Sequence, residues 1–246
     1  MKNTIKSFKS IDELSQFFAR KLVSCSNKTP EGHFFSMVLS GGSTPRKVFD
    51  YLALNFRNHI DWKKILVFWG DERCVVPESE ESNYRMAKES LLDQVPIPAD
   101  NIFRIKGEAD PSAESDRYAD IVRQHVPLFN NIPQFDFVML GLGYDGHTVS
   151  IFPGSLHLFS SDKLFDVTEK TYTKQRRITA TGKIINNART VIFLVTGESK
   201  AEIVALVIER KDGWEKLPAS MVHPENGELI WLLDNKAAIK LNTPDK

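Results

Sequence analysis

The sequence predicts one α/β domain built on a mainly parallel, Rossmann-like sheet with helices on both of its faces. Two observations carry this prediction. The expected strands are short runs that are apolar throughout, which is typical of strands buried on both faces of a sheet. They alternate along the chain with segments whose apolar residues recur at helical spacing. No repeat, low-complexity tract or clear linker divides the 246 residues, so a single domain spanning 1–246 is expected.

The strands are expected where short apolar or β-branched runs occur, at 34–39, 65–69, 135–140, 177–181, 190–195 and 229–233. Helices are expected where apolar residues lie three and four positions apart behind residues that favour a helix start. The expected starts are the capping box Ser10-x-x-Glu13, Pro45, Ser82, Asp110 and a second capping box, Ser199-x-x-Glu202. Residues 2–9 are expected only to lead into the first helix.

Composition narrows the classes of function. Lysine plus arginine balance aspartate plus glutamate at 32 each, which argues against nucleic acid or an anionic membrane as the main partner. Cys25 and Cys74 lack metal-ligand spacing, so we expect a reducing compartment, the cytoplasm, and no disulfide framework. No signal-peptide core or membrane-length apolar run is found. We expect no metal, no cofactor, and a monomer or weak homodimer.

A glycine turn between a strand and a helix, residues 40–45, is a candidate phosphate site. Its glycines free backbone amides, and a helix N-terminus adds unpaired N–H groups and the positive end of a dipole. The groups that would bind belong to Gly41, Gly42, Ser43 and Thr44. Arg46 and Lys47 sit in the first helical turn, where a bound anion would offset their unfavourable position. The alternative is an ordinary turn with a serine cap.

Further cations could hold the same anion. Lys200 lies just after Gly197 and the expected cap Ser199, so a cation again falls at a helix N-terminus. Arg176 and Arg177 open an expected strand, and paired arginines suit bidentate contacts with phosphate. A solvated lysine and a charge-protected strand edge are the alternatives.

Acid and base candidates follow two buried strands at the edge where open α/β sheets bind ligands. Asp71, Glu72 and Arg73 come directly after the strand at 65–69, and they could serve acid–base chemistry, hold an oxyanion or form a salt-bridged loop. Asp145 and His147 lie in the glycine-rich turn after the strand at 135–140. A carboxylate two residues from an imidazole can fix its tautomer, so His147 is the expected proton handler. A capped turn is the alternative.

These motifs, in this order, resemble the 6-phosphogluconolactonase family. The segments that carry the resemblance are LSGGSTPRKVF (39–49), VFWGDERCV (67–75), ESNYRMAKESLL (81–92), FVMLGLGYDGHTVSIFPG (137–154), RRITATGKIINNARTVIFLVTGESKAE (176–202), PASMVHP (218–224) and WLLDNKAA (231–238). They span most of the chain. The resemblance implies hydrolysis of 6-phospho-D-glucono-1,5-lactone to 6-phospho-D-gluconate in the oxidative pentose phosphate pathway, without metal.

The roles expected for this chemistry are specific. His147 would deprotonate a water and return the proton to the leaving ring oxygen, with Asp145 or Asp71 orienting the imidazole. Arg73 would stabilise charge or hold the sugar. The 6-phosphate would be held by residues that include Gly42, Ser43, Arg177 and Lys200, so that remote binding positions the reacting carbon.

Two other functions remain open on the same fold. Glucosamine-6-phosphate deaminases share several of these motifs but carry Asn-Glu-Pro after the Asp-Gly-His segment. Here that stretch is Ile151-Phe152-Pro153-Gly154, without a carboxylate, which favours the lactonase. A non-enzymatic module that senses sugar phosphates would keep the phosphate residues and would not need His147.

Overall fold

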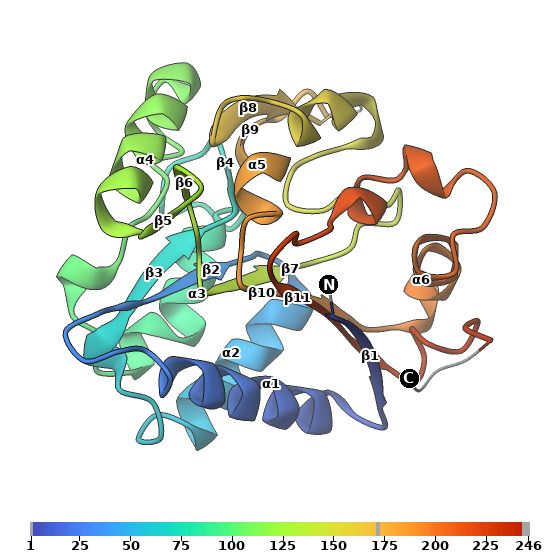
Figure 1. The fold of residues 1–246 in the computed structure, drawn as a ribbon, viewed down its shortest axis with the longest axis horizontal. Coiled ribbons are helices and arrows are strands. Elements are labelled where there is room, and N and C mark those ends of the chain that lie inside the picture. Colours follow the sequence, from blue (N-terminus) through green and yellow to red (C-terminus); the bar gives the residue numbers. More distant parts are fainter. Residues whose placement is uncertain (1, 171–172, 243–246) are drawn as a thin grey trace.

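The centre of the molecule is a six-stranded sheet in the order β1-β11-β10-β7-β2-β3, with every neighbouring pair parallel (Figure 1). The computed structural model describes residues 2–170 and 173–242. The strands are β1 (Lys2–Phe8), β2 (Phe35–Leu39), β3 (Ile65–Trp69), β7 (Phe137–Leu140), β10 (Thr190–Val195) and β11 (Glu228–Asp234). The expected α/β class with a mainly parallel sheet is confirmed.

Strand burial explains the continuous apolar runs. Every residue of β2, β3, β7 and β10 is buried, because both faces of the sheet are covered. The strand β1 was not expected. It is an edge strand that pairs only with β11, and its described side chains are half-buried or exposed, so its sequence shows no apolar run.

The α-helices are α1 (Ile11–Ser26), α2 (Ser43–Asn55), α3 (Asn83–Ser90), α4 (Pro111–His125), α5 (Gly182–Ile185) and α6 (Ala201–Ile208). Shorter 3₁₀ turns lie at Trp62–Lys64, Leu92–Gln94, Ala99–Asn101, Pro153–Phe159, Glu198–Lys200, Trp214–Lys216 and Pro218–Met221. Three expected caps form: Ser10, Ser82 and Asp110 each accept a backbone N–H three residues on.

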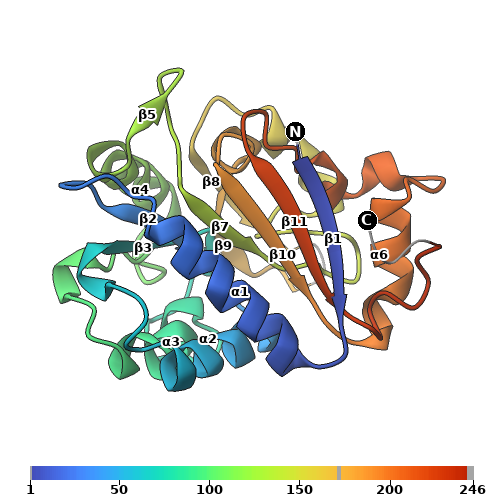
Figure 2. The same cartoon turned by 60° about the horizontal axis from the view of Figure 1, so that its bottom comes forward.

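Two layers cover the sheet. The helices α1 and α2 lie on one face, and α4, α5 and a small second sheet lie on the other (Figures 1 and 2). Buried side chains from both sides form one contiguous core, in which Phe18 of α1 meets Phe137 of β7 edge to face at 5.4 Å. No described helix has both the length and the apolar character that a membrane crossing requires.

The second sheet corrects two expectations. It is antiparallel, in the order β4-β9-β8, and consists of β4 (Asp71–Arg73), β9 (Arg176–Ala180) and β8 (Phe165–Glu169). The strand expected at 177–181 therefore does not belong to the main sheet. The charged triplet 71–73 is a strand and not a loop, because it pairs with β9 far along the chain. A small hairpin joins β5 (Leu128–Phe129) and β6 (Ile132–Pro133).

The second expected capping box is absent. Ser199 lies inside the 3₁₀ turn before α6, and Lys200 occupies the cap position without a side-chain cap bond. The turn is held from elsewhere, since the amide of Gly197, at φ 96°, donates to both carboxylate oxygens of Asp234. Asp234 ends β11, so a residue distant in sequence fixes the turn that precedes α6.

Candidate active site

A cavity of about 410 Å³ opens where β2, β7 and β10 end. The predicted residues that line it are Gly41, Gly42, Ser43, Thr44, Asp71, Arg73, His147, Arg177 and Lys200. Asp145 does not line the cavity but hydrogen bonds to His147, and Arg176 is exposed outside it. Residues that are distant in sequence are thus gathered at one edge of the sheet, where parallel α/β folds bind ligands.

His147 is held by Asp145. Its ring Nδ1 lies 2.5 Å from Asp145 Oδ1, and its backbone N–H donates to the same oxygen at 3.1 Å. Burial raises the pKa of Asp145, but the hydrogen bond and charge of His147 outweigh it and lower the pKa to about 2. An ionised carboxylate can only accept, so Nδ1 carries the hydrogen, and in the neutral imidazole the lone pair is then on Nε2. That nitrogen can act as a base.

The His147–Asp145 pair requires a glycine beside it. A Cβ on Gly143 would lie 2.0 Å from His147 Nδ1 and 2.7 Å from Asp145 Oδ1, far inside contact distance. The Gly143 amide also donates to the carbonyl of His147 at 2.8 Å, which closes the loop on itself. This local reason accounts for the second glycine of the Gly-Leu-Gly-Tyr-Asp-Gly-His segment.

Asp71 also lines the cavity, and its carboxylate contacts residues other than His147. Its carboxylate is buried and accepts from Ser150 Oγ at 2.6 Å and from Asn83 Nδ2 at 3.4 Å. Of the two carboxylates considered for orienting His147, only Asp145 hydrogen bonds to it among the described residues. Ser150 reaches Asp71 from a tight turn in which Val149 has φ 45°, a strained value for a β-branched residue.

Glu72 is structural. Its buried carboxylate accepts the amides of Arg73, Asn83 and Tyr84, each at 2.8 Å, and the Ser82 hydroxyl at 3.0 Å. Burial raises the pKa of Glu72, while these bonds act in the opposite direction. The carboxylate therefore anchors the start of α3 beneath the site. Its oxygens are fully used there, so the acid–base role considered for Glu72 is not supported by its contacts.

Two arginines form the cationic wall. Arg73 and Arg177 are partners across β4 and β9, and the buried Nε of each has no hydrogen-bond partner within the described part of the chain. Arg177 is 8% exposed and donates to Gln175 Oε1 at 2.9 Å and to Ser150 Oγ at 3.4 Å. Burial and the nearby Arg73 charge lower the pKa of Arg177 from its ordinary, very high value. Unpaired donors on adjacent cations suit an anion.

Lys200 and the start of α2 also line the cavity. Burial lowers the pKa of Lys200, and Tyr144 and Asp145 oppose that shift. The helix α2 begins at Ser43, earlier than the expected Pro45, and Gly42 at φ 116° occupies the cap position with no side-chain cap bond. The serine-cap alternative is therefore wrong. Thr44 Oγ1 hydrogen bonds to Thr196 Oγ1 at 2.7 Å, so one of the expected phosphate donors already has a partner.

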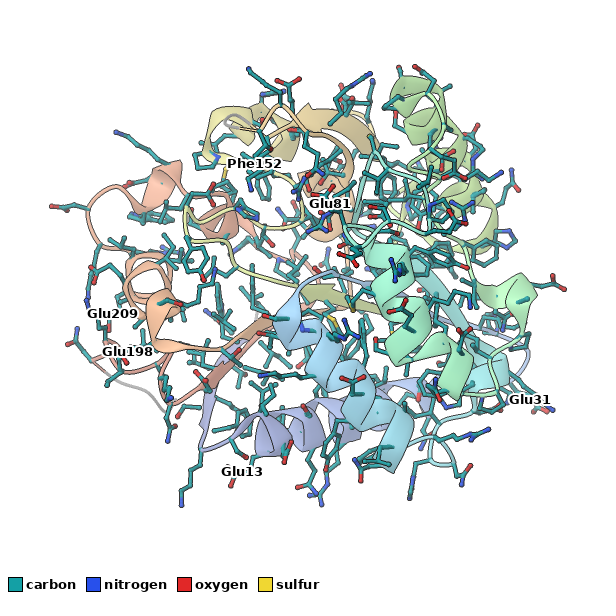
Figure 3. All side chains as sticks on the ribbon, turned by 180° about the vertical axis from the view of Figure 1, so that it is seen from behind. Glu13, Glu31, Glu81, Phe152, Glu198 and Glu209 are labelled. Atoms are coloured by element: carbon teal, nitrogen blue, oxygen red, sulfur yellow. The ribbon has the colours of Figure 1, made fainter. Side chains whose placement is uncertain are left out.

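Several lining residues were not anticipated as site residues. They are Asn83, Tyr144, Val149, Phe152, Lys170 and Thr196. Thr196 could have been found, because it follows β10 at the same sheet edge. Asn83 could not have been found, because it is brought to the site by the hydrogen bond between its amide and the Glu72 carboxylate. It packs against Gly41 so closely that a Cβ added to Gly41 would lie 1.8 Å from Asn83 Oδ1. Phe152 lies between His147 and Arg177, 4.9 Å from the imidazole ring; Figure 3 labels it near β8 and β9.

A parallel sheet covered on both faces, with an imidazole–carboxylate pair and a cationic cavity at its strand ends, is the arrangement of an α/β enzyme. Residues 9–231 match the family described as glucosamine-6-phosphate isomerases/6-phosphogluconolactonase, and the chain belongs to that family. A 6-phosphogluconolactonase of Haemophilus influenzae is 39% identical over 210 residues, covering 85% of this chain and 88% of that protein. One of Synechocystis is 40% identical over 208 residues, covering 84% of each.

Solved structures of similar fold support the same family assignment. The 6-phosphogluconolactonase of Trypanosoma brucei has a TM-score of 0.81 and 31% identity, covering 98% of each chain. That of Thermotoga maritima has a TM-score of 0.82 and 27% identity, covering 95% of this chain and all of the other. A monomeric glucosamine-6-phosphate deaminase has a TM-score of 0.79 at 22% identity, covering 98% of this chain and all of the other, which shows a shared fold alone.

Proposed function

We propose that this chain hydrolyses 6-phospho-D-glucono-1,5-lactone to 6-phospho-D-gluconate, the lactone-opening step of the oxidative pentose phosphate pathway. The observation that carries the proposal is the placement of His147, tied through Nδ1 to Asp145, in a cavity whose walls carry Arg73, Arg177 and Lys200. The relatives named 6-phosphogluconolactonase, which match most of the chain, support the same activity.

His147 acts as general base and then as general acid. Its Nε2 takes a proton from water as the water oxygen attacks the lactone carbonyl carbon, giving a tetrahedral oxyanion. Asp145 stabilises the imidazolium that forms, and its low pKa keeps it ionised throughout. The oxyanion then collapses, the bond to the ring oxygen breaks, and the imidazolium returns the proton to that oxygen. No step passes through a metal or cofactor.

The phosphate supplies remote binding energy. Arg177 and Lys200, with the backbone at Gly41, Gly42 and Ser43, hold the 6-phosphate, and Arg73 stabilises the developing charge or holds the sugar. The positive end of α2 faces the same cavity and adds to the attraction. Thr44 supports the phosphate site indirectly, because its hydroxyl hydrogen bonds to that of Thr196 and so links the start of α2 to the segment after β10.

The deaminase alternative has the weaker support. Residues 148–151 form a tight turn, and Pro153 opens a 3₁₀ helix, so the stretch after His147 presents Phe152 to the cavity and no carboxylate. Ring-opening of an amino sugar would need a proton carrier at that position. A sensing module would leave the His147–Asp145 pair without a task.

The setting we propose is a cytoplasmic protein, one domain over 1–246, acting as a monomer or weak homodimer on a small-molecule substrate without nucleic-acid or membrane partners. The balanced charge of the chain fits this proposal.

Two substrates offered separately test the function. Fresh 6-phosphogluconolactone should release acid well above its spontaneous rate, followed by pH-stat titration with the background subtracted. Glucosamine 6-phosphate should release no ammonia. Ammonia production at a rate that rivals lactone opening would replace the proposed activity with the deaminase, and the absence of both would favour the sensing module.

A further inference from the structure

Tyr144 is a large aromatic side chain exposed on the loop that carries His147. It is 71% exposed, yet its ring centroid lies only 3.3 Å from Lys200 Nζ. Both residues line the cavity. A cation this close to an aromatic face is held by the ring quadrupole, and the contact is stronger where the cation is partly removed from water, as Lys200 is.

Nothing else described holds the Lys200 ammonium. Within residues 2–170 and 173–242 it forms no ion pair with a carboxylate. Glu198, two residues away, lies exposed at the periphery of the molecule (Figure 3). Asp145 is engaged by His147. Lys200 also occupies the cap position of α6, where the helix dipole disfavours a cation. Its partner is therefore the Tyr144 ring.

We propose that Tyr144 is a positioning residue that holds the Lys200 ammonium toward the cavity so that it meets the phosphate of the substrate. The inference rests on the proposed function and adds a residue to it. A neutral ring fixes the ammonium without neutralising it, so the full charge stays available to the phosphate. A carboxylate in the same place would compete with the phosphate for the lysine.

Holding Lys200 in place lowers the cost of binding. A free lysine side chain loses rotamer entropy when it grips a ligand, and a side chain already ordered against a ring loses less. The effect belongs to substrate binding and not to the chemical step, since His147 and Asp145 keep their own contacts. Loss of the ring should therefore raise KM and leave kcat and the pH profile of kcat unchanged.

The test compares Tyr144→Leu, which removes the ring, with Tyr144→Phe, which keeps it and loses only the hydroxyl. Tyr144→Leu should raise KM for 6-phosphogluconolactone about three- to tenfold, and Tyr144→Phe should restore it to within about twofold of wild type. Tyr144→Glu should be impaired like Tyr144→Leu or worse. Phe34→Leu, at an exposed aromatic outside the cavity, is the matched control and should behave as wild type.

A double mutant separates positioning from a general effect on the loop. In a Lys200→Met background, Tyr144→Leu should cause no further rise in KM. An unchanged KM in Tyr144→Leu, an equal loss in Tyr144→Phe, or a full additive loss in the Lys200→Met background would each overturn the inference. A fall in kcat or a displaced pH profile would do so too, by showing that the His147 loop itself had moved.

A binding measurement keeps this inference distinct from the proposed function. Inorganic phosphate titrated by calorimetry needs no turnover, and its affinity should fall in Tyr144→Leu and recover in Tyr144→Phe. If wild type fails to open the lactone, the proposed activity is wrong, while this titration still reports on the Tyr144–Lys200 contact. If wild type is active but phosphate binds all three proteins equally, the positioning role is wrong and the activity stands.

Discussion

Arg73 and Arg177 face each other as register partners on antiparallel strands, and each carries a buried Nε–H with no hydrogen-bond partner among the residues that the structure describes. Two adjacent guanidinium groups repel, and an unsatisfied buried donor costs about 1–3 kcal/mol. Asp71, close enough to favour the charged form of Arg177, offsets part of this cost. An anionic ligand would offset the rest, which is the physical basis for placing substrate charge here.

Replacement of Arg177 should therefore lower the catalytic efficiency with the phosphorylated lactone more than with the unphosphorylated one. The loss of one charge-assisted contact is worth about 1.5–3 kcal/mol, so Arg177→Ala should lower kcat/KM by about one to two decades. Arg176→Ala is the matched control, because Arg176 is exposed and outside the cavity. Steady-state kinetics with 6-phosphogluconolactone and with unphosphorylated gluconolactone decide the matter. Equal efficiency of wild type on both lactones would contradict the phosphate assignment.

Loss of the His147 imidazole should slow the chemical step. A general base accelerates a reaction by about 10²- to 10⁴-fold, so His147→Ala and His147→Asn should each lower kcat by a factor in that range with little change in KM. The asparagine variant keeps a side chain that can hydrogen bond to Asp145 but cannot take the proton. If it folds normally and keeps most of the wild-type kcat, His147 is a structural cap and the base is to be sought at Asp71.

Asp145→Asn should slow the chemical step. The pKa of Asp145 is lowered to about 2, so the carboxylate stays charged across the working range and can stabilise the imidazolium that forms as the water loses its proton. Without that charge the maximal kcat should fall, while KM should change little because the phosphate is held by other residues. Rates recorded with spontaneous lactone hydrolysis subtracted test this. An unchanged kcat would show that Asp145 does not act on the imidazole during the reaction.

The same shift has a consequence for stability. A lowered carboxyl pKa contributes stability above the unfolded value of about 3.9, and that contribution is lost as pH falls toward the folded value of about 2. The stability gap between wild type and Asp145→Asn should close across that acid interval, which urea unfolding at stepped pH would show.

Gly143→Ala should disable the site without removing any of its functional groups. The added Cβ would lie 2.0 Å from His147 Nδ1, so the loop must shift and the imidazole–carboxylate pair must separate. We expect kcat to fall by about tenfold or more. Gly154→Ala is the control, because a Cβ there meets nothing within 4 Å and the residue does not line the cavity. Wild-type kcat in Gly143→Ala would mean that the observed pair is not the catalytic geometry.

Chelation should leave the activity intact. The proposed mechanism activates water through His147, and the described residues contain no group of three or more His, Cys, Asp or Glu that could hold a metal ion. Lactonase assays after exhaustive dialysis against EDTA provide the measurement. Activity that is lost and then restored by a divalent ion would require a different mechanism.

The features that could be predicted from the sequence are those that depend on residues close together along the chain. The fully buried strands β2, β3, β7 and β10 produce continuous apolar runs, and the rule that ligands bind beyond strand ends then placed the functional side chains near one another. What could not be predicted depends on distant partners. Residues 71–73 become a strand only through β9, and the turn before α6 is held by Asp234 and not by its own serine. β1 has too little burial to leave a pattern.

The cavity is assembled from parts of the chain that lie far apart in sequence: the segments 40–45, 71–73, 141–152 and 194–200, and the single residues Asn83, Lys170 and Arg177. No part of it exists in the unfolded protein, so any ligand that binds there binds the native state alone. Such a ligand raises the free energy of unfolding by about 2.7 kcal/mol at one hundred times its Kd. A sugar phosphate bound in the cavity should therefore protect the whole molecule, and not the site alone, against heat and proteolysis.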